Sequence, residues 1–211
     1  MYSAGFTFGY RLFFIMMQQF FKDLEKIIET IDKQPIGMLL NALESLQRAN
    51  GRLFILGVGG SAANASHAVN DFRKLTGIEA YAPTDNIAEL TARTNDEGFE
   101  TIFVEWLKVS RLRKKDMVLI FSVGGGNKEK NVSVNLIQAL DYAKKVGAKT
   151  AGIVGRDGGY TKKVADICVL IPTVNKYLVT PFVESFQAMI WHFFAFHPNL
   201  NIKEGKWESV R

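Results

Sequence analysis

The chain has 211 residues, of which 47% are hydrophobic and 22% are charged. This balance is typical of a globular protein and excludes a disordered chain, and the length suits a single domain with a full core. The formal net charge of +5 does not predict a nucleic-acid partner, because the basic residues are scattered except at 111–115, a cluster typical of a solvated helix end.

The single cysteine, Cys168, lies within the apolar run 165–171. One cysteine cannot form a disulfide within the chain, and this usage is typical of a reducing compartment. The sequence therefore predicts a cytoplasmic protein.

Residues 1–21 are rich in aromatic side chains but have no basic start and no small-residue cleavage site, which argues against a signal peptide. Arg11 interrupts the apolar stretch before it reaches membrane-spanning length, so we expect no membrane partner. We interpret residues 1–16 as an N-terminal extension, either flexible or added by an upstream start codon, and residues 17–211 as one domain.

Two helices are expected first along the chain. Between residues 17 and 31 the apolar side chains recur at three- and four-residue spacing, which indicates an amphipathic helix. A second helical pattern, 38–49, ends at Asn50-Gly51, where glycine can adopt the left-handed conformation that closes a helix.

A strand, a glycine turn and a helix then follow one another twice. The first unit has a strand over 52–56 and a helix over 62–75, and the second has a strand over 117–121 and a helix over 131–146. Short apolar strands separated by helices are typical of a parallel sheet covered on both faces. We therefore predict an α/β fold, a doubly wound five-stranded parallel sheet with N-terminal helices. The remaining expected elements are strands over 79–82, 150–154 and 167–171 and a last helix over 180–196.

The two glycine turns are candidate phosphate sites. In open parallel sheets ligands bind beyond the carboxyl ends of the strands, where glycines let the backbone approach an anion and free helix N–H groups face it. One such turn is equally consistent with a tight strand-to-helix connection, whereas two at neighbouring strand ends favour a phosphate. The spacing matches neither G-x-G-x-x-G nor G-x-x-x-x-G-K-[ST], so no nucleotide cofactor is predicted. The candidate substrate-binding residues are Gly59, Gly60 and Ser61 in the first turn and Ser122, Gly124 and Gly125 in the second.

Titratable side chains lie on the helices that follow. His67 and Asp71 are four residues apart and therefore share one helix face. Glu184 and His192 lie on the last expected helix. Each of these residues alone has a simpler structural interpretation, such as a packed histidine or a solvated acid. Together, downstream of two anion turns, they favour a functional cluster.

Asn95 and Asp96 precede Gly98 in a further polar segment. These two residues are equally consistent with a turn and with contacts to sugar hydroxyls, and we include them among the candidate substrate-binding residues.

In combination these motifs resemble the sugar isomerase (SIS) domain, specifically its phosphoheptose isomerase branch. The resemblance rests on the first glycine turn followed by His67, the segment 95–99, Ser122 before a glycine loop, and Gly155-Arg-Asp-Gly-Gly159. It covers residues 17–197 and implies a flavodoxin-like sheet, a homotetramer, and conversion of sedoheptulose 7-phosphate to a heptose 7-phosphate. One relative in this branch is a non-catalytic regulator, so a sugar-phosphate-binding or regulatory protein is the alternative. An isomerase of hexose or amino-sugar phosphates is a third hypothesis.

By this resemblance Ser61 and Ser122 bind the phosphate, but the turns depart from the family pattern. The family's second loop usually reads Ser-Thr-Ser-Gly-Asn-Ser, whereas this chain reads Ser122-Val-Gly-Gly-Gly-Asn127 and lacks two hydroxyls. Val58 replaces an asparagine of the first loop. The phosphate grip is therefore expected to depend more on backbone N–H groups.

The resemblance also implies a catalytic and metal-binding set, His67, Asp71, Glu184 and His192, at positions that usually hold His, Glu, Gln and His. Two histidines with carboxylate oxygens suit Zn²⁺ or another divalent ion, and Glu184 is also expected to contact substrate. Aldose–ketose isomerisation needs a base beside the carbonyl, and we expect Asp71 as that base and His192 as the acid. Glu184 and His192 are about 12 Å apart along an ideal helix, so they meet only if Glu184 leans in from the helix start.

Overall fold

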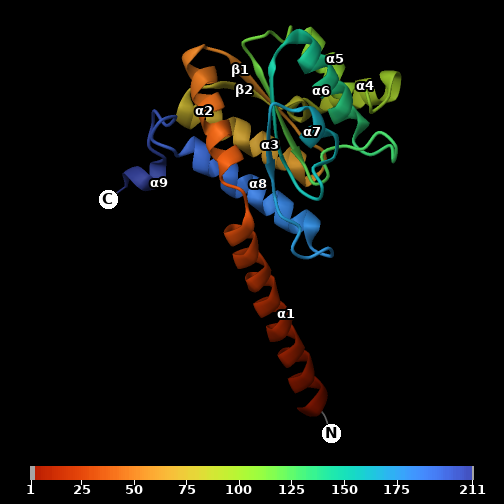
Figure 1. Cartoon of the computed structure of the whole chain (residues 1–211), viewed down its shortest axis with the longest axis vertical. Helices are drawn as coiled ribbons and strands as arrows, with labels where there is room; N and C mark the ends of the chain where they lie inside the picture. The colour runs from red at the N-terminus through yellow and green to blue at the C-terminus, as the bar shows by residue number, and fades with distance from the viewer. Residues whose placement is uncertain (1–2, 211) are drawn as a thin grey trace.

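Five parallel strands form one sheet in the order β2-β1-β3-β4-β5 in the computed structural model, which describes residues 3–210 and the side chains of residues 14–210 (Figure 1). This arrangement confirms the predicted doubly wound α/β fold. The strands are β1 (Arg52–Leu56), β2 (Glu79–Tyr81), β3 (Met117–Ser122), β4 (Lys149–Val154) and β5 (Ile167–Leu170).

Helices cover both faces of the sheet. One hydrophobic core joins the sheet to α2, α3, α8 and the end of α1, and a second core joins its other face to α5 and α6, with α4 and α7 packed at its margin. The helices are α1 (Ser3–Thr30), α2 (Gln34–Arg48), α3 (Gly60–Asp71), α4 (Ile87–Glu97), α5 (Ile102–Val109), α6 (Val134–Val146), α7 (Gly159–Val164), α8 (Val179–Ala195) and α9 (Lys206–Ser209), with a π-helical turn at Phe72–Thr76 and a 3₁₀ turn at Pro83–Asp85.

The alternation of side chains along β1 explains the two cores. Leu53 and Ile55 belong to the first core, while Phe54 and Leu56 belong to the second, and all four are fully buried. Successive residues of a strand point to opposite faces of the sheet, so a strand covered on both faces must be apolar throughout.

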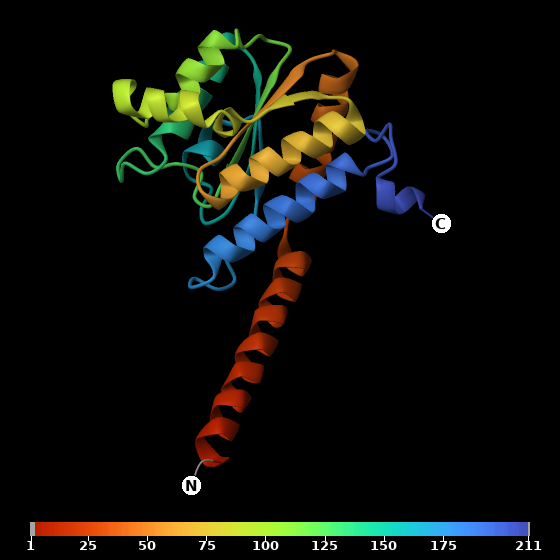
Figure 2. The same cartoon turned by 180° about the vertical axis from the view of Figure 1, so that it is seen from behind.

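Helix α1 begins at Ser3 and not at Met17 as expected, and Figures 1 and 2 show it projecting from the rest of the molecule. Among the described side chains of this helix, Ile27 in its last turns is fully buried, while Met16 is 66% exposed. The helix runs unbroken across the expected boundary between residues 16 and 17, and that division stays a prediction. Residues 1, 2 and 211 of the expected ranges lie outside the described residues. Between residues 3 and 210, no helix is both long and apolar enough to cross a membrane.

Two further expectations about helix limits are wrong. Helix α6 begins at Val134 and not at Asn131, because Asn131 and Ser133 have left-handed φ angles of 51° and 52° that a helix cannot contain. The expected helix over 62–75 gives way after Asp71 to the π-helical turn.

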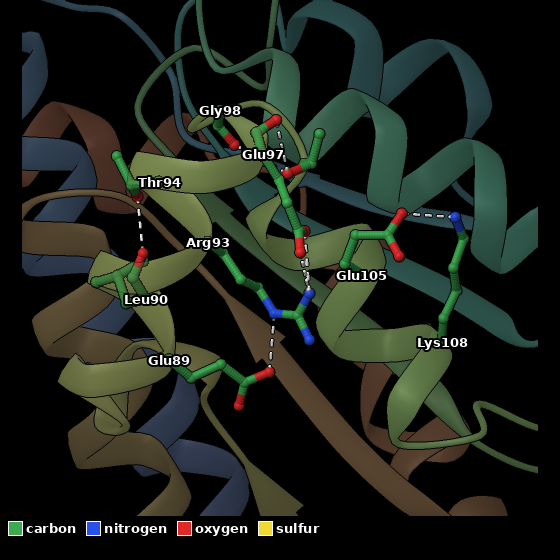
Figure 3. A network of polar contacts seen from close by, with 9 residues as sticks. Glu89, Leu90, Arg93, Thr94, Glu97, Gly98, Glu105 and Lys108 are labelled. Carbon is green, nitrogen blue, oxygen red and sulfur yellow. Dashed lines mark hydrogen bonds and ion pairs between the residues drawn. The ribbon is translucent and has the colours of Figure 1, made fainter.

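The sequence did not predict α4 or α5. Helix α4 has no buried residue, so it lacks the apolar stripe by which a helix is recognised. Ion pairs join successive turns of this helix: Arg93 lies between Glu89 and Glu97, with nitrogen–oxygen distances of 2.9 and 3.0 Å (Figure 3).

A buried ion pair joins the amino ends of β1 and β3. The side chain of Asp116 is fully buried and accepts hydrogen bonds from the Arg52 guanidinium at 2.6 Å, the Arg52 N–H at 3.0 Å and the Arg113 N–H at 2.9 Å. Burial raises the pKa of Asp116, but these hydrogen bonds together lower it by more, so the pKa lies below its usual value. The pair therefore ties the two central strands together in its ionised form.

Asp116→Ala is expected to lower the free energy of unfolding by about 3 kcal/mol, because it leaves the Arg52 guanidinium without its carboxylate. Urea denaturation at neutral pH measures this change. Because the pKa of Asp116 is lowered in the folded state, its contribution is present above about pH 4 and is lost as the pH falls through the lowered value.

Glu29→Ala is the control, since it removes an exposed carboxylate of α1 and should change the free energy by less than about 0.5 kcal/mol. Two results contradict this account of the ion pair. One is a difference in the free energy of unfolding between wild type and Asp116→Ala that does not become smaller in acid. The other is equal stability of Asp116→Ala and Glu29→Ala at neutral pH.

Candidate active site

Both glycine turns lie at the point where the strand order reverses. The chain passes from β1 outward to β2 on one side and continues through β3, β4 and β5 on the other, and β1 pairs directly with β3. Ligands of open parallel sheets bind beyond the carboxyl ends of the strands at this point. A cavity of about 490 Å³ lies there, and Ser61 of the first turn and Ser122 and Gly124 of the second line it together.

The first turn carries unpaired donors, and Ser61 of this turn lines the cavity, whereas Gly59 and Gly60 do not. Gly59 has a φ of 64°, which glycine adopts without strain, and it begins α3. The N–H groups of Gly60 and Ser61 donate to no acceptor within the described part of the chain. The Ser61 hydroxyl is also buried and has no hydrogen-bond partner among the described residues. A buried unpaired hydroxyl beside a helix N-terminus suits an anion.

The second turn is organised mainly by its own backbone. Ser122 Oγ accepts the N–H of Gly125 at 3.0 Å. Gly125 itself does not line the cavity, because it lies against the backbone of Gly158, where a Cβ would clash. Its expected substrate contact stays a prediction, whereas Ser122 and Gly124 lie where a phosphate could contact them.

His67, Asp71 and His192 come together at the other end of α3. One possible ligand atom from each lies within 4.8 Å of the others, and His192 Nε2 is 3.7 Å from Asp71 Oδ2. The Asp71 side chain is only 12% exposed, and its other oxygen accepts from Asn70 at 2.8 Å. The cluster thus holds an ionisable pair in a fixed position.

The tautomer of His192 follows from its partner. Nδ1 lies 2.8 Å from the carbonyl oxygen of Ala188, which can only accept, so Nδ1 carries the proton. In the neutral ring Nε2 is then unprotonated, and it faces the carboxylate of Asp71. Metal-binding histidines typically donate their other N–H to a carbonyl in this way. The three residues therefore fit a divalent metal such as zinc, and they equally fit proton transfer.

Glu184 does not join this cluster. Its carboxylate lies against Gly60 at the start of α3, and its backbone oxygen accepts from Asn64 at 2.8 Å. Figure 2 shows α8, in blue, lying along α3, in orange-yellow, and the two helices run in the same direction. Two helical turns therefore separate Glu184 from His192. The expectation that Glu184 ligates a metal with the other three is corrected, while its contact with substrate stays a prediction.

Helix α3 contributes Ser61 to the cavity and His67 and Asp71 to the cluster, but the cluster lies outside the cavity. His67 follows Ser61 by six residues, which is about 9 Å along the helix axis. None of His67, Asp71 and His192 lines the cavity within the described residues.

Asn95 and Asp96 lie in the last turn of α4, where Asn95 donates to Asp96 at 2.7 Å. Both are exposed, and neither lines the cavity. These residues lie in a helix and not in a turn. Their contact with sugar hydroxyls stays a prediction.

Sequence reasoning missed several of the cavity's lining residues, and the two basic ones are Lys130 and Arg156. Arg156 stands within the motif Gly155-Arg-Asp-Gly-Gly159, and a basic residue directly beyond a central strand is the signal that could have identified it.

Comparisons with known proteins identify the family of the chain. A family model described as the SIS domain matches residues 19–155. A phosphoheptose isomerase of Helicobacter pylori is 31% identical over 81% of this chain and 83% of its own length. That of a Nitratiruptor species is 32% identical over 81% of this chain and 88% of its own length.

Among solved structures, phosphoheptose isomerase GmhA from Neisseria gonorrhoeae shares the fold, with a TM-score of 0.73 and 22% identity over 88% of this chain and 95% of that one. The chain belongs to the SIS domain family and, within it, to the phosphoheptose isomerase branch.

Proposed function

We propose that the protein is an aldose–ketose isomerase that converts sedoheptulose 7-phosphate into a heptose 7-phosphate. The observation that carries the proposal is the buried, unpaired hydroxyl of Ser61 at one end of α3, with the Asp71–His192 pair near its other end. The first feature suits a phosphate, and the second suits the movement of a proton.

In the proposed reaction the phosphate binds at the two glycine turns and fixes the sugar's position. Asp71 removes a proton from the carbon next to the carbonyl, which gives an enediol, and returns it to the neighbouring carbon. His192, through Nε2, exchanges a proton with the sugar oxygens, so that protons and electrons balance with no net redox change. A divalent metal at the cluster, when bound, supplies Lewis-acid polarisation of the sugar oxygens.

The absence of all three cluster residues from the cavity lining favours one alternative, a protein that binds a sugar phosphate without turning it over. This alternative predicts the same phosphate site but no proton exchange, so assays of binding and of turnover separate the two functions.

We further propose a homotetramer in the cytoplasm, as the family resemblance and the single thiol suggest. Its support is the apolar surface that α1 and α8 leave exposed in the single chain. The large apolar residues at least 50% exposed there include Ile15, Met16, Phe21, Ile28, Met189 and Phe193.

Asp71→Asn is expected to lower turnover of sedoheptulose 7-phosphate at least about 100-fold, because it removes the proposed base but keeps the side chain's shape. A coupled assay of heptose 7-phosphate formation measures the loss. Asp71→Glu restores a carboxylate and should remain active. Equal rates for Asp71→Asn and wild type would exclude Asp71 as the base.

Ser61→Ala is expected to weaken binding of inorganic phosphate about tenfold, because it removes a hydroxyl donor buried beside the anion. The shift in melting temperature during a phosphate titration measures binding without turnover. Ser45→Ala, on α2, is the control and should leave the shift unchanged. If Ser61→Ala retains the full shift, the first turn is not the phosphate site.

Zn²⁺ binding is expected to be lost in His192→Ala and retained in Glu184→Gln, because His192 belongs to the three-residue cluster and Glu184 does not. Isothermal titration calorimetry of the metal-free protein with zinc measures both variants. Loss of binding in both variants would instead support the four-residue site that the sequence predicts.

A further inference from the structure

The second phosphate turn of this chain is short of donors. From residue 122 to residue 127 the only hydroxyl belongs to Ser122. That hydroxyl oxygen already accepts the N–H of Gly125, which removes one backbone donor from those available to an anion. A phosphate at this turn therefore requires compensation for its charge from other groups.

Two cationic side chains line the same cavity. The ammonium of Lys130 and the guanidinium of Arg156 form no hydrogen bond or ion pair with any residue between 14 and 210. Nearby, Lys128 is paired with Asp141 at 3.3 Å. The carboxylate among the lining residues, Asp157, accepts the N–H of Gly159 at 3.1 Å. With two cations and one carboxylate among its lining residues, the cavity carries a net positive charge.

The backbone places Arg156 over the second turn. Its φ of 54° lies in the left-handed region, which costs free energy for a residue with a Cβ and persists where the surrounding structure enforces it. The side chain crosses Gly124, where an added Cβ would lie 3.3 Å from Arg156 Cδ. Glycine at position 124 therefore leaves room for the arginine.

Lys130 is carried by a short hairpin. Asn127 and Val132 exchange backbone hydrogen bonds of 2.9 and 3.0 Å, and the side chain of Asn127 accepts the N–H of Lys130 at 2.8 Å. Lys128 anchors the hairpin to Asp141 of α6. The hairpin thus holds Lys130 at the rim of the cavity.

We infer that Arg156 and Lys130 supply the phosphate-binding charge that the missing hydroxyls would otherwise share, and that they set the preference for a dianionic phosphate ester over an uncharged sugar. The inference deepens the proposed function and rests on its phosphate site. Such binding weakens as salt is added, because part of it comes from charges that solvent ions screen. It strengthens as the pH rises through the second phosphate ionisation, at about pH 6 for an ester.

The test compares wild type, Arg156→Gln, Lys130→Gln and the double variant by calorimetric titration with inorganic phosphate at two salt concentrations. Each single variant should bind phosphate about tenfold more weakly, the double variant about 100-fold more weakly, and its binding should depend less on salt. Arg156→Lys keeps the charge and should retain most of the affinity. Lys145→Gln, which removes an exposed cation of α6 outside the cavity, is the control.

Phosphate affinity in Arg156→Gln and Lys130→Gln equal to that of Lys145→Gln overturns the inference. Circular dichroism of each variant excludes unfolding as the cause of a loss. The proposed function is tested separately: a wild type that binds phosphate through these cations but does not isomerise sedoheptulose 7-phosphate leaves the inference standing and overturns the isomerase.

Discussion

Parallel pairing of β1 with β3 brings the two glycine turns to the same edge of the sheet. The strands are in register from Leu53 opposite Met117 to Leu56 opposite Ile120, so the chain leaves both strands at the same level. The loop after β4 is tied to this edge as well, since Gly155 N–H donates to Val123 at 3.1 Å. The cavity, the free N–H groups of α3 and the position of Arg156 all depend on this alignment.

Helix α3 connects binding with chemistry. Its first turn contributes donors to the cavity, and its last residue, Asp71, faces His192 of α8. Because α8 runs alongside in the same direction, a residue near the start of either helix lies by the phosphate turn, and one near the end lies by the cluster. This explains why Glu184 and His192, two turns apart on one helix, belong to different parts of the site.

The sequence predicted the strands because a parallel strand buried on both faces must be apolar throughout. It predicted both turns because glycines directly follow two of these apolar segments. It missed α4, which buries no side chain, and misplaced the start of α6, where Asn131 and Ser133 adopt a conformation that their residue types do not reveal. Among site residues, the pairing of His67 with Asp71 follows from helix periodicity, whereas the separation of Glu184 depends on how α8 lies against α3. Lys130 and Arg156 could not be singled out, because a sequence does not show which surface cations find a carboxylate partner.

A crystal structure of the protein with sedoheptulose 7-phosphate tests the central claim most directly, because one complex locates both ends of the sugar. The account predicts the phosphate between the two glycine turns, within hydrogen-bond distance of Ser61 Oγ, and carbons 1 and 2 beside Asp71 and His192. A phosphate bound away from both turns, or carbons 1 and 2 directed away from that pair, would contradict it.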